Sequence, residues 1–272
     1  GFCAAVIAGM VFLLGMPVPL AAAEAVTVVV EGLEGEVLRN VREALVLPAG
    51  LVQEGAVDRL WLDRFAAQAP ETVRTAVEPY GYYRARIAAA VEDAGPGAYR
   101  LRVTVTPGEP VRVSEATLVI AGPGSRELAA PIPLRRGDVL LHRTYEEFKA
   151  ELLNRAQELG YLDAGFSVHE IRIDREATSA RIRLEMKTGE RYFFNGARLE
   201  GASDYPEPFL RRYLAFKPGD PFSPALLGET QLNFVNSERF REVTVTPEKD
   251  EARDLRVPVR VQLTPASRRS LR

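Results

Sequence analysis

The residue types that most often carry chemistry are scarce in this sequence of 272 residues. It contains two histidines, His142 and His169, and one cysteine, Cys3. Zinc sites draw four ligands mainly from cysteine and histidine, so we expect no zinc site here. One thiol also excludes an internal disulfide. The sequence leaves a catalytic Ser-His-Asp triad as an alternative, but no G-x-S-x-G motif supports it. We therefore expect both histidines to be surface or half-buried polar residues.

Three short motifs match known signatures only in part. Residues 187–190 read KTGE and contain the K-T-G triplet of penicillin-recognising enzymes, but the accompanying S-x-x-K motif is missing from the sequence. Residues 136–138 read RGD, and residues 122–124 read GPG without the third glycine of a dinucleotide-binding loop. We interpret all three as turn or loop chemistry, in which glycine supplies unusual backbone angles.

Composition indicates an ordinary folded protein. Hydrophobic residues make up 46% of the chain and charged residues 26%, and the formal net charge is −2. A near-neutral chain has no electrostatic footprint for nucleic acid, so no nucleic-acid partner is expected.

The first 24 residues resemble a secretory signal peptide. Residues 2–20 are almost entirely apolar, and an A-x-A site for cleavage lies at residues 21–23 or 23–25. The usual basic segment is missing before them, so we interpret residues 1–24 as a clipped signal peptide. A transmembrane anchor is the alternative, but two prolines interrupt a stretch that is barely long enough to cross a bilayer.

One pattern of strand and turn occurs twice. Residues 99–110 read YRLRVTVTPGEP and residues 180–191 read ARIRLEMKTGER, each with alternating apolar residues followed by a Gly-Glu turn. A repeat at this spacing, about 80 residues, indicates a tandem array of small domains.

The segments around each copy extend the repeat. A further alternating strand precedes each copy, at residues 81–93 and 160–174, and each of these strands begins with Gly-Tyr. Another strand follows each copy, at residues 111–122 and 192–201.

A helix is predicted before the second Gly-Tyr, over residues 144–160. Thr144 and Glu147 fit a capping box. Gly160 stands where a helix commonly ends in a left-handed residue. One face of this helix carries the apolar residues Phe148, Leu152, Ala156 and Leu159.

Two further copies complete the array. The third has a helix that starts at Ser223 with Pro224 in its first position, then strands at residues 241–250 and 255–265. The first has a strand from Val26 and helices that we expect to be interrupted at Pro70. Each copy is β-α-α-β-β, so the predicted fold class is α+β, with a helix pair on a three-stranded mixed sheet. The predicted domains span residues 25–108, 109–189 and 190–266, and residues 267–272 begin a linker.

The array has a physical consequence for binding. A three-stranded sheet has two edge strands with unpaired backbone groups, so tandem units form an elongated rod with many open edges. Such edges suit capture of an extended polypeptide as an added strand.

These features resemble the POTRA domains of the Omp85 family. The resemblance rests on the order of elements in three copies, on the Gly-Tyr junctions, and on RRGD at residues 135–138 and KPGD at residues 217–220 before the long helices. Three units behind a signal peptide are most similar to the TamA-like translocation and assembly members. The resemblance implies a transmembrane β-barrel downstream, which is absent from this chain.

The resemblance implies a function without catalysis. TamA-like proteins help to insert or secrete β-barrel proteins and autotransporters, and their POTRA arm lies in the periplasm at the cell outer membrane. The implied partners are a TamB-like protein anchored in the inner membrane, unfolded outer-membrane protein clients, and the outer membrane itself through the barrel. No cofactor is implied.

Two alternatives stay open. A BamA-type protein usually carries five such domains and a two-partner-secretion transporter two, so a count of three favours the TamA-like interpretation. A free-standing secreted scaffold, or an enzyme with a cleft between units, would lack a barrel altogether.

The candidate partner-binding site is the predicted outer strand of the first unit. We expect core packing for Trp61 and Phe65, junction packing for Tyr82 and Tyr83, and a solvated basic end at residues 268–272. The predicted edge strand consists of Tyr83, Arg84, Ala85, Arg86, Ile87, Ala88, Ala89, Ala90 and Val91.

Overall fold

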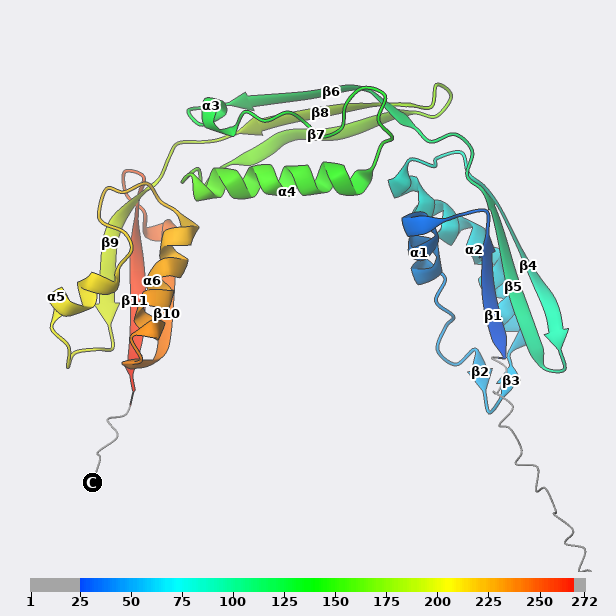
Figure 1. The fold of residues 1–272 in the computed structure, drawn as a ribbon, viewed down its shortest axis with the longest axis horizontal. Coiled ribbons are helices and arrows are strands. Elements are labelled where there is room, and N and C mark those ends of the chain that lie inside the picture. The colour runs from blue at the N-terminus through cyan, green and yellow to red at the C-terminus, as the bar shows by residue number, and fades with distance from the viewer. Residues whose placement is uncertain (1–24, 267–272) are drawn as a thin grey trace, which may run out of the picture.

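The computed structural model describes residues 25–266. The predicted signal peptide with Cys3, the predicted linker and the basic end lie outside this range. Three three-stranded sheets follow one another along the chain, each with its own helices, and together they form an arch (Figure 1). The predicted α+β class and the tandem β-α-α-β-β order are confirmed, and the elongated array curves instead of running straight.

The first unit adds a small hairpin to the predicted order. Its elements are β1 (Val26–Glu31), α1 (Gly35–Ala44), β2 (Val52–Gln53), β3 (Ala56–Val57), α2 (Arg59–Val77), the 3-10 turn η1 (Glu78–Tyr80), β4 (Arg86–Gly95) and β5 (Ala98–Thr106). The predicted break at Pro70 is wrong, because α2 continues through it. An internal proline costs a helix about 3 kcal/mol. The apolar stripe of α2, from Leu62 to Val77, is buried against the core and offsets that cost.

The second unit has one long helix and one single-turn helix. Its elements are β6 (Arg112–Ala121), α3 (Ser125–Leu128), α4 (His142–Glu158), β7 (Gly165–Asp174) and β8 (Ser179–Lys187). The helix α4 starts two residues before the predicted cap, so Thr144 lies inside it and the predicted capping box is not formed. Gly160 has the expected left-handed angle, with φ of 89°. Phe148, Leu152 and Ala156 are buried as predicted.

The third unit repeats this plan. Its elements are β9 (Phe193–Glu200), α5 (Glu207–Leu210), the 3-10 turn η2 (Arg211–Tyr213), α6 (Pro224–Asn236), β10 (Phe240–Pro247), the 3-10 turn η3 (Lys249–Glu251) and β11 (Arg256–Pro265). Ser223 is the N-cap residue of α6 and Pro224 its first residue, as predicted, although the Ser223 side chain bonds elsewhere.

All three sheets share one strand order. The last strand of each unit lies in the centre, parallel to the first strand and antiparallel to the second. In the first unit, Val28 pairs with Leu101 and Ala89 pairs with Val103. Parallel strands need a long crossover, and the helices of each unit supply it. The first and second strands of every unit are therefore sheet edges.

Each unit has a core of its own. The central strands are buried on the helix-facing side, as at Leu101, Leu184 and Val261, which are fully shielded from solvent. In the third unit the core is aromatic: the ring of Phe194 stacks on Phe216 with centroids 4.0 Å apart. In the middle of the arch, α4 lies on the concave side and its sheet on the convex side (Figure 1).

Candidate functional site

The candidate site is the outer edge of β4, and it starts later than predicted. The strand runs from Arg86 to Gly95, so Tyr83, Arg84 and Ala85 lie in the turn before it. That part of the predicted edge is therefore wrong. The turn is held by backbone hydrogen bonds, including one from Tyr83 N to Gly81 O of 3.2 Å. The six remaining predicted residues, 86–91, do lie on an edge strand.

Side chains of β4 alternate between two faces. Ile87, Ala89 and Val91 pack against the core of the first unit, as does Ala85 in the preceding turn. The other face carries Arg86 together with Ala88 and Ala90, which are exposed and small. Small side chains on an edge allow a second backbone to approach closely, and alternate backbone groups of an edge strand point outward.

Charge on the solvent side of this sheet is partly paired. Arg102 of the central strand donates to Glu92 of β4 over 2.8 Å, and it also forms an ion pair with Glu31 of β1. The hydrogen bond from Arg102 lowers the pKa of Glu92. Arg86 and Arg100 on the same side form no ion pair with a described residue, so the exposed sheet face keeps a small positive excess.

Other edges of the chain are partly covered. In the second unit, Val113 N donates to Asp138 O over 2.9 Å, and Gly137 N donates to Val113 O over 2.8 Å. The third unit forms the same pair of bonds between Phe194 and the turn at Gly219 and Asp220, at 2.9 and 2.8 Å. Nothing in the described part of the first unit covers β1 in this way.

These covering turns are the RRGD and KPGD motifs. The carboxylates of Asp138 and Asp220 accept from the backbone N of Arg135 and Lys217, over 2.7 and 2.8 Å. The glycine before each aspartate has a φ above +90°. The RGD carboxylate therefore serves the turn itself, and residues 187–190 likewise form a turn after β8, with Gly189 at φ of 68°.

The Gly-Tyr motifs mark the joints between units. Gly81 O accepts from Val111 N over 2.8 Å, and Gly160 O accepts from Tyr192 N over 2.8 Å. In both joints a glycine that ends a helical segment also holds the first residue of the next unit. Both glycines have φ close to +90°. Tyr83 packs at the first joint, as predicted, whereas Tyr82 packs against the core of the first unit.

The second joint has more polar contacts than the first. Glu158 at the end of α4 accepts from Ser223 Oγ over 3.1 Å and from Ala225 N over 3.4 Å at the start of α6. A carboxylate from one unit thus caps the helix of the next, where the helix dipole favours negative charge. Lys249 reaches back to Asp163 over 2.6 Å and to Leu162 O over 3.1 Å.

At the first joint, Tyr83 Oη lies 2.6 Å from His142 Nε2. Burial raises the pKa of Tyr83 to about 12. Arg175, from the turn between β7 and β8, reaches Glu78 over 3.5 Å. Tyr83 is therefore part of the joint.

We expect this joint to weaken at acidic pH through His142. Burial lowers the pKa of His142, although Glu146 and Glu78 act in the opposite direction. The neutral imidazole is thus favoured in the folded chain. Stability from this group is complete above the ordinary histidine pKa of about 6.5 and is lost as the pH falls through that value and then through the lowered one.

Urea unfolding of the chain and of the His142→Gln variant, at pH values from 5 to 8, measures this effect. The free-energy difference between the two proteins should shrink toward low pH. The exposed His169 supplies the control, because His169→Gln should leave the pH dependence unchanged. Identical profiles for both variants would contradict the assignment.

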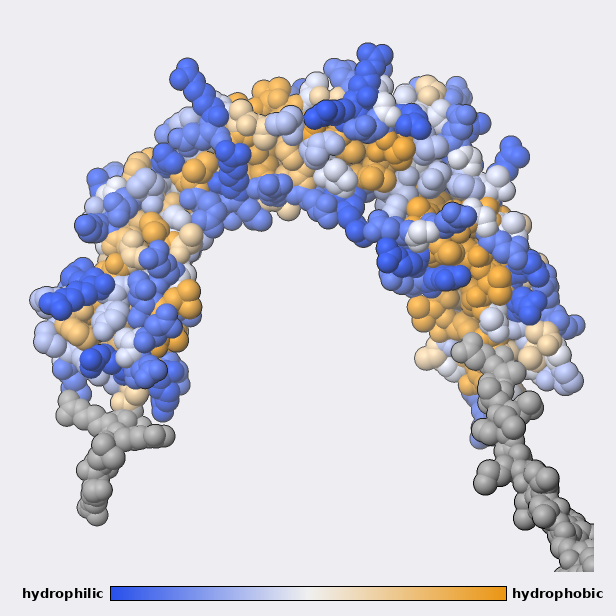
Figure 2. Space-filling model, viewed as in Figure 1, coloured by the Kyte–Doolittle hydropathy of each residue, from blue (hydrophilic) through white to orange (hydrophobic). Residues whose placement is uncertain are grey.

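The first unit exposes apolar side chains that the sequence analysis placed in the core. Leu62 is fully buried and Phe65 packs against the core, but Trp61 is 37% exposed and Leu60 is 64% exposed. The expectation of core packing is therefore wrong for Trp61, whose ring lies on the solvent side of α2 close to Gly50. Figure 2 shows apolar surface gathered on this unit, at the right of the view.

No cluster of three or more histidine, cysteine, aspartate or glutamate side chains within residues 25–266 could hold a metal ion. Within the same range, no helix combines the length and the apolar character needed to cross a membrane.

Comparison with known proteins agrees with this geometry. Residues 27–107 match the family model described as POTRA domain, TamA domain 1. Over 88% of its length the chain is similar in fold to POTRA domains 3–5 of BamA from Haemophilus influenzae, with 18% sequence identity, 95% of that chain covered and a TM-score of 0.50.

Two other solved structures are less similar. POTRA domains 1–3 of the periplasmic domain of Omp85 from Anabaena match 89% of this chain and 94% of theirs, at 18% identity and a TM-score of 0.30. CdiB from Acinetobacter baumannii matches 57% of this chain and 30% of its own, at 13% identity and a TM-score of 0.31. Residues 27–107 thus match the model of the first TamA POTRA domain, and the chain as a whole is similar in fold to a three-domain POTRA arm.

Proposed function

We propose that this chain is the periplasmic arm of a TamA-like outer-membrane assembly and translocation factor. It binds proteins without making or breaking bonds, and it acts at the periplasmic face of the cell outer membrane. Its proposed partners are a TamB-like protein of the inner membrane and unfolded β-barrel or autotransporter clients. The observation that carries the proposal is the tandem array of small sheets whose first unit, residues 27–107, matches the first TamA domain.

The β4 edge supports a binding mode for such partners. Its outer backbone groups are unpaired within the described chain, and Ala88 and Ala90 present little bulk beside them. An extended partner would add as a fourth strand, with backbone hydrogen bonds for affinity and side-chain contacts for selectivity. The predicted domain bounds at residues 108/109 and 189/190 remain part of this proposal.

A BamA-type role is the second candidate. The likeness in fold to the three-domain arm of Haemophilus influenzae BamA, with a TM-score of 0.50, favours it. The same edges would then serve general insertion of β-barrel proteins.

Photo-crosslinking in the native host separates these roles. A crosslinking amino acid in place of the exposed Ala88 should capture a TamB-like protein or autotransporter clients. Capture of further β-barrel assembly components would support the BamA-type role, and capture of one dedicated secreted exoprotein would support two-partner secretion. A soluble protein that shows no outer-membrane association, with no captured partner at this position, would overturn the proposal.

Proline substitutions test the edge itself. Neighbouring strand residues direct their N–H groups to opposite sides, so one of Ala88→Pro and Ala89→Pro removes an outward donor and the other disrupts pairing with β5. We expect the variant that keeps the wild-type melting temperature to lose crosslinking at an adjacent position such as Ala90. The matched control places proline at His169 on the edge strand β7. Undiminished crosslinking in both β4 variants would exclude this edge as the binding strand.

A further inference from the structure

Two adjacent hollows lie at the first joint, and together we call them the joint pocket. The smaller hollow, of about 310 Å³, is lined mainly by residues of the first unit, among them Arg84, Arg86 and Thr106. The larger hollow, of about 470 Å³, is lined by residues of the second unit around the start of β6. Glu109 and Thr178 line both, so the two hollows share a wall. Both volumes fall within the range of small-molecule sites, about 300–1,000 Å³.

Each hollow of the joint pocket contains two arginines, and the two pairs come from different units. Arg84 and Arg86 belong to the first unit, whereas Arg112 and Arg136 belong to the second. All four are exposed, and none forms an ion pair with a carboxylate of residues 25–266. Arg102 behaves differently, because it pairs with two glutamates on the sheet of the first unit. The charges of the joint pocket are therefore left without a partner in the described chain.

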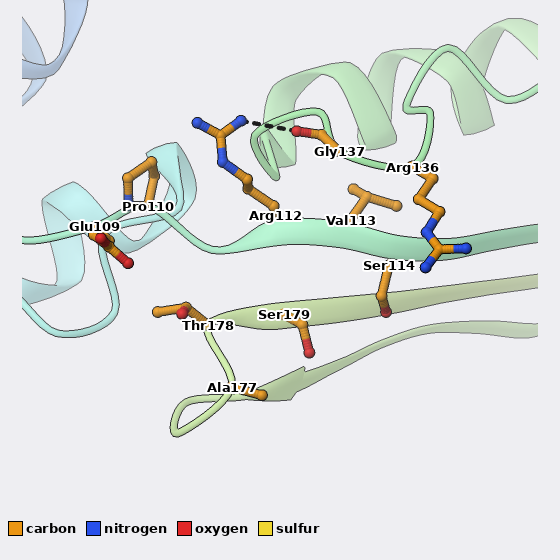
Figure 3. Close-up of a pocket in the computed structure, with 10 residues that line it drawn as sticks. All are labelled: Glu109, Pro110, Arg112, Val113, Ser114, Arg136, Gly137, Ala177, Thr178 and Ser179. Atoms are coloured by element: carbon orange, nitrogen blue, oxygen red, sulfur yellow. Dashed lines mark hydrogen bonds between the residues drawn. The ribbon is translucent and has the colours of Figure 1, made fainter.

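Most of the hydrogen-bonding capacity of the joint pocket is also unused. Of its four arginines, only Arg112 donates to a described group, over 2.8 Å to Gly137 O (Figure 3). Each guanidinium carries five donors, so nearly all of them are left for a ligand. Thr178 and Ser179 add two hydroxyl groups that bond to no described side chain or carbonyl, whereas the neighbouring Ser114 hydroxyl donates to a backbone carbonyl over 2.9 Å.

The lining of the joint pocket carries an excess of positive charge. Glu109 is the one carboxylate in the described lining, against four arginines, and it is exposed. This excess occurs in a chain whose net charge is −2, so it is a local concentration of charge. The repulsion among the four guanidinium groups decreases when an anion lies between them.

The chemistry of the pocket favours phosphate over carboxylate. Two guanidinium groups in one hollow bring five donors each, whereas a carboxylate offers only two oxygens. A phosphate group offers three acceptor oxygens and up to two negative charges, and its oxygens match the planar fork of arginine. Since each hollow has its own arginine pair, the joint pocket suits an anion with two phosphate groups.

An anion in this place would strengthen the weaker of the two joints. Two ion pairs connect the first and second units in the described chain, and they measure 3.5 and 3.8 Å. The longer one, between Arg143 and Glu36, lies between two exposed side chains and contributes little. Across the second joint, Lys249 lies 2.6 Å from Asp163. A ligand held by arginines of both units would supply the short charged contacts that the first joint lacks.

We propose that the joint pocket binds an anion with two phosphate groups, one in each hollow, and that the bound anion fixes the orientation of the first two units. Arg84 and Arg86 bind one phosphate group, and Arg112 and Arg136 bind the other. The ligand is either a free diphosphate or the headgroup of a lipid with two phosphates. The site involves no pairing of strands and does not rest on the proposed function.

Isothermal titration of the full chain with inorganic pyrophosphate tests the site. Pyrophosphate should bind, and the affinity should fall with salt because the charges are exposed. The double variant Arg84→Gln, Arg136→Gln removes one arginine from each hollow, and neither side chain makes a hydrogen bond within the described chain. It should weaken binding by about tenfold or more, since it removes two charge-assisted contacts. Each single variant should also weaken binding, which keeps the test valid if the double variant does not fold.

A matched control keeps the same change in net charge. Arg64 and Arg212 are exposed, lie in the first and third units, and form no ion pair with a described residue. The double variant Arg64→Gln, Arg212→Gln should change the affinity for pyrophosphate by less than about twofold. An equal loss of affinity in both double variants would show that pyrophosphate responds only to overall charge, and the site would be wrong.

Spin labels test whether the bound anion fixes the joint. Cysteines introduced for the exposed Gln68 on α2 and Glu147 on α4, with Cys3 replaced by serine, place one label on each unit. Pyrophosphate should narrow the distance distribution in the chain with all four arginines and leave it unchanged in Arg84→Gln, Arg136→Gln. Binding that leaves both distributions unchanged would contradict a ligand that bridges the two units.

Two further probes identify the source of the phosphate groups. Vesicles of phosphatidylcholine with cardiolipin, whose headgroup carries two phosphates, should bind and be displaced by pyrophosphate if the ligand is a lipid. Binding of pyrophosphate without binding of these vesicles would assign the site to a soluble diphosphate. The proposal is wrong if neither probe binds, or if the peptide acetyl-EEEE-amide binds more tightly than pyrophosphate. None of these results depends on the β4 edge, so the proposed function keeps its own test.

Discussion

Replacing Gly201 with alanine is expected to unfold the third unit. Gly201 follows β9 with φ of 81°, and a Cβ atom there would lie 2.3 Å from the carbonyl oxygen of Leu263 in the central strand. Left-handed angles cost a non-glycine residue about 1–2 kcal/mol. The clash with backbone adds to this, because neither strand can move without breaking its ladder. We expect the free energy of unfolding of the third unit to fall by about 3–5 kcal/mol, which is a large part of the stability of a small domain.

Gly55 provides the control for this substitution. It has nearly the same angle, with φ of 82°, but nothing lies within 4 Å of its added Cβ atom. Gly55→Ala should therefore lower the free energy of unfolding only by the cost of the left-handed backbone angle, about 1 kcal/mol. Urea unfolding measures both variants, together with hydrogen exchange in β10 and β11 for Gly201→Ala and in β4 and β5 of the first unit for Gly55→Ala. Equal losses of unfolding free energy in the two variants would show that the close approach of Gly201 to Leu263 does not affect stability. Gly32 stands at the same place in the first unit, with its Cβ position 1.9 Å from Val105 O.

Replacing Gly160 with alanine is expected to open the joint between the second and third units. An added Cβ atom would lie 3.0 Å from both Phe222 O and Tyr192 O, and φ is 89°. Tyr192 N donates to Gly160 O, so the start of the third unit must shift to make room. We expect the contact between the two units to lose about 2–3 kcal/mol of stability. Each unit itself should stay folded, because it keeps its own core.

Distances between spin labels measure the joint directly. Labels at cysteines introduced for Glu151 on α4 and Glu229 on α6, both exposed, span it, with Cys3 replaced by serine. The distance distribution should broaden in Gly160→Ala. Gly97→Ala is the control, because Gly97 has φ of 73° and open space around its Cβ position. An unchanged, narrow distribution in Gly160→Ala would show that the remaining contacts, such as that of Lys249 with Asp163, hold the joint alone.

The repeat could be predicted from sequence because its signals are local. Alternation in residues 99–106 and 180–187 is a property of a single strand, and Ser223 followed by Pro224 is a property of a single helix start. Because the same signals occur in three copies, the predicted strand bounds lie within a few residues of the observed ones. The predicted edge position of β4 followed from the order of elements alone.

The candidate site was predicted less well, because its residues take their roles from neighbouring units. Tyr83 has the alternation of a strand residue, yet its hydroxyl group contacts His142 across the first joint.

The sequence by itself determined the three β-α-α-β-β units and the turns that carry glycine, because backbone preference and apolar alternation act over a few residues. Tertiary structure alone decided that α2 continues through Pro70, that Trp61 is exposed, and that the array is an arch. These outcomes depend on contacts between residues far apart in the chain, whose energies exceed local propensities of a few kcal/mol or less. Gly81 and Gly160 combine both kinds of information. The sequence predicts that each glycine ends a helical segment, but only the folded chain shows that the next unit packs against it.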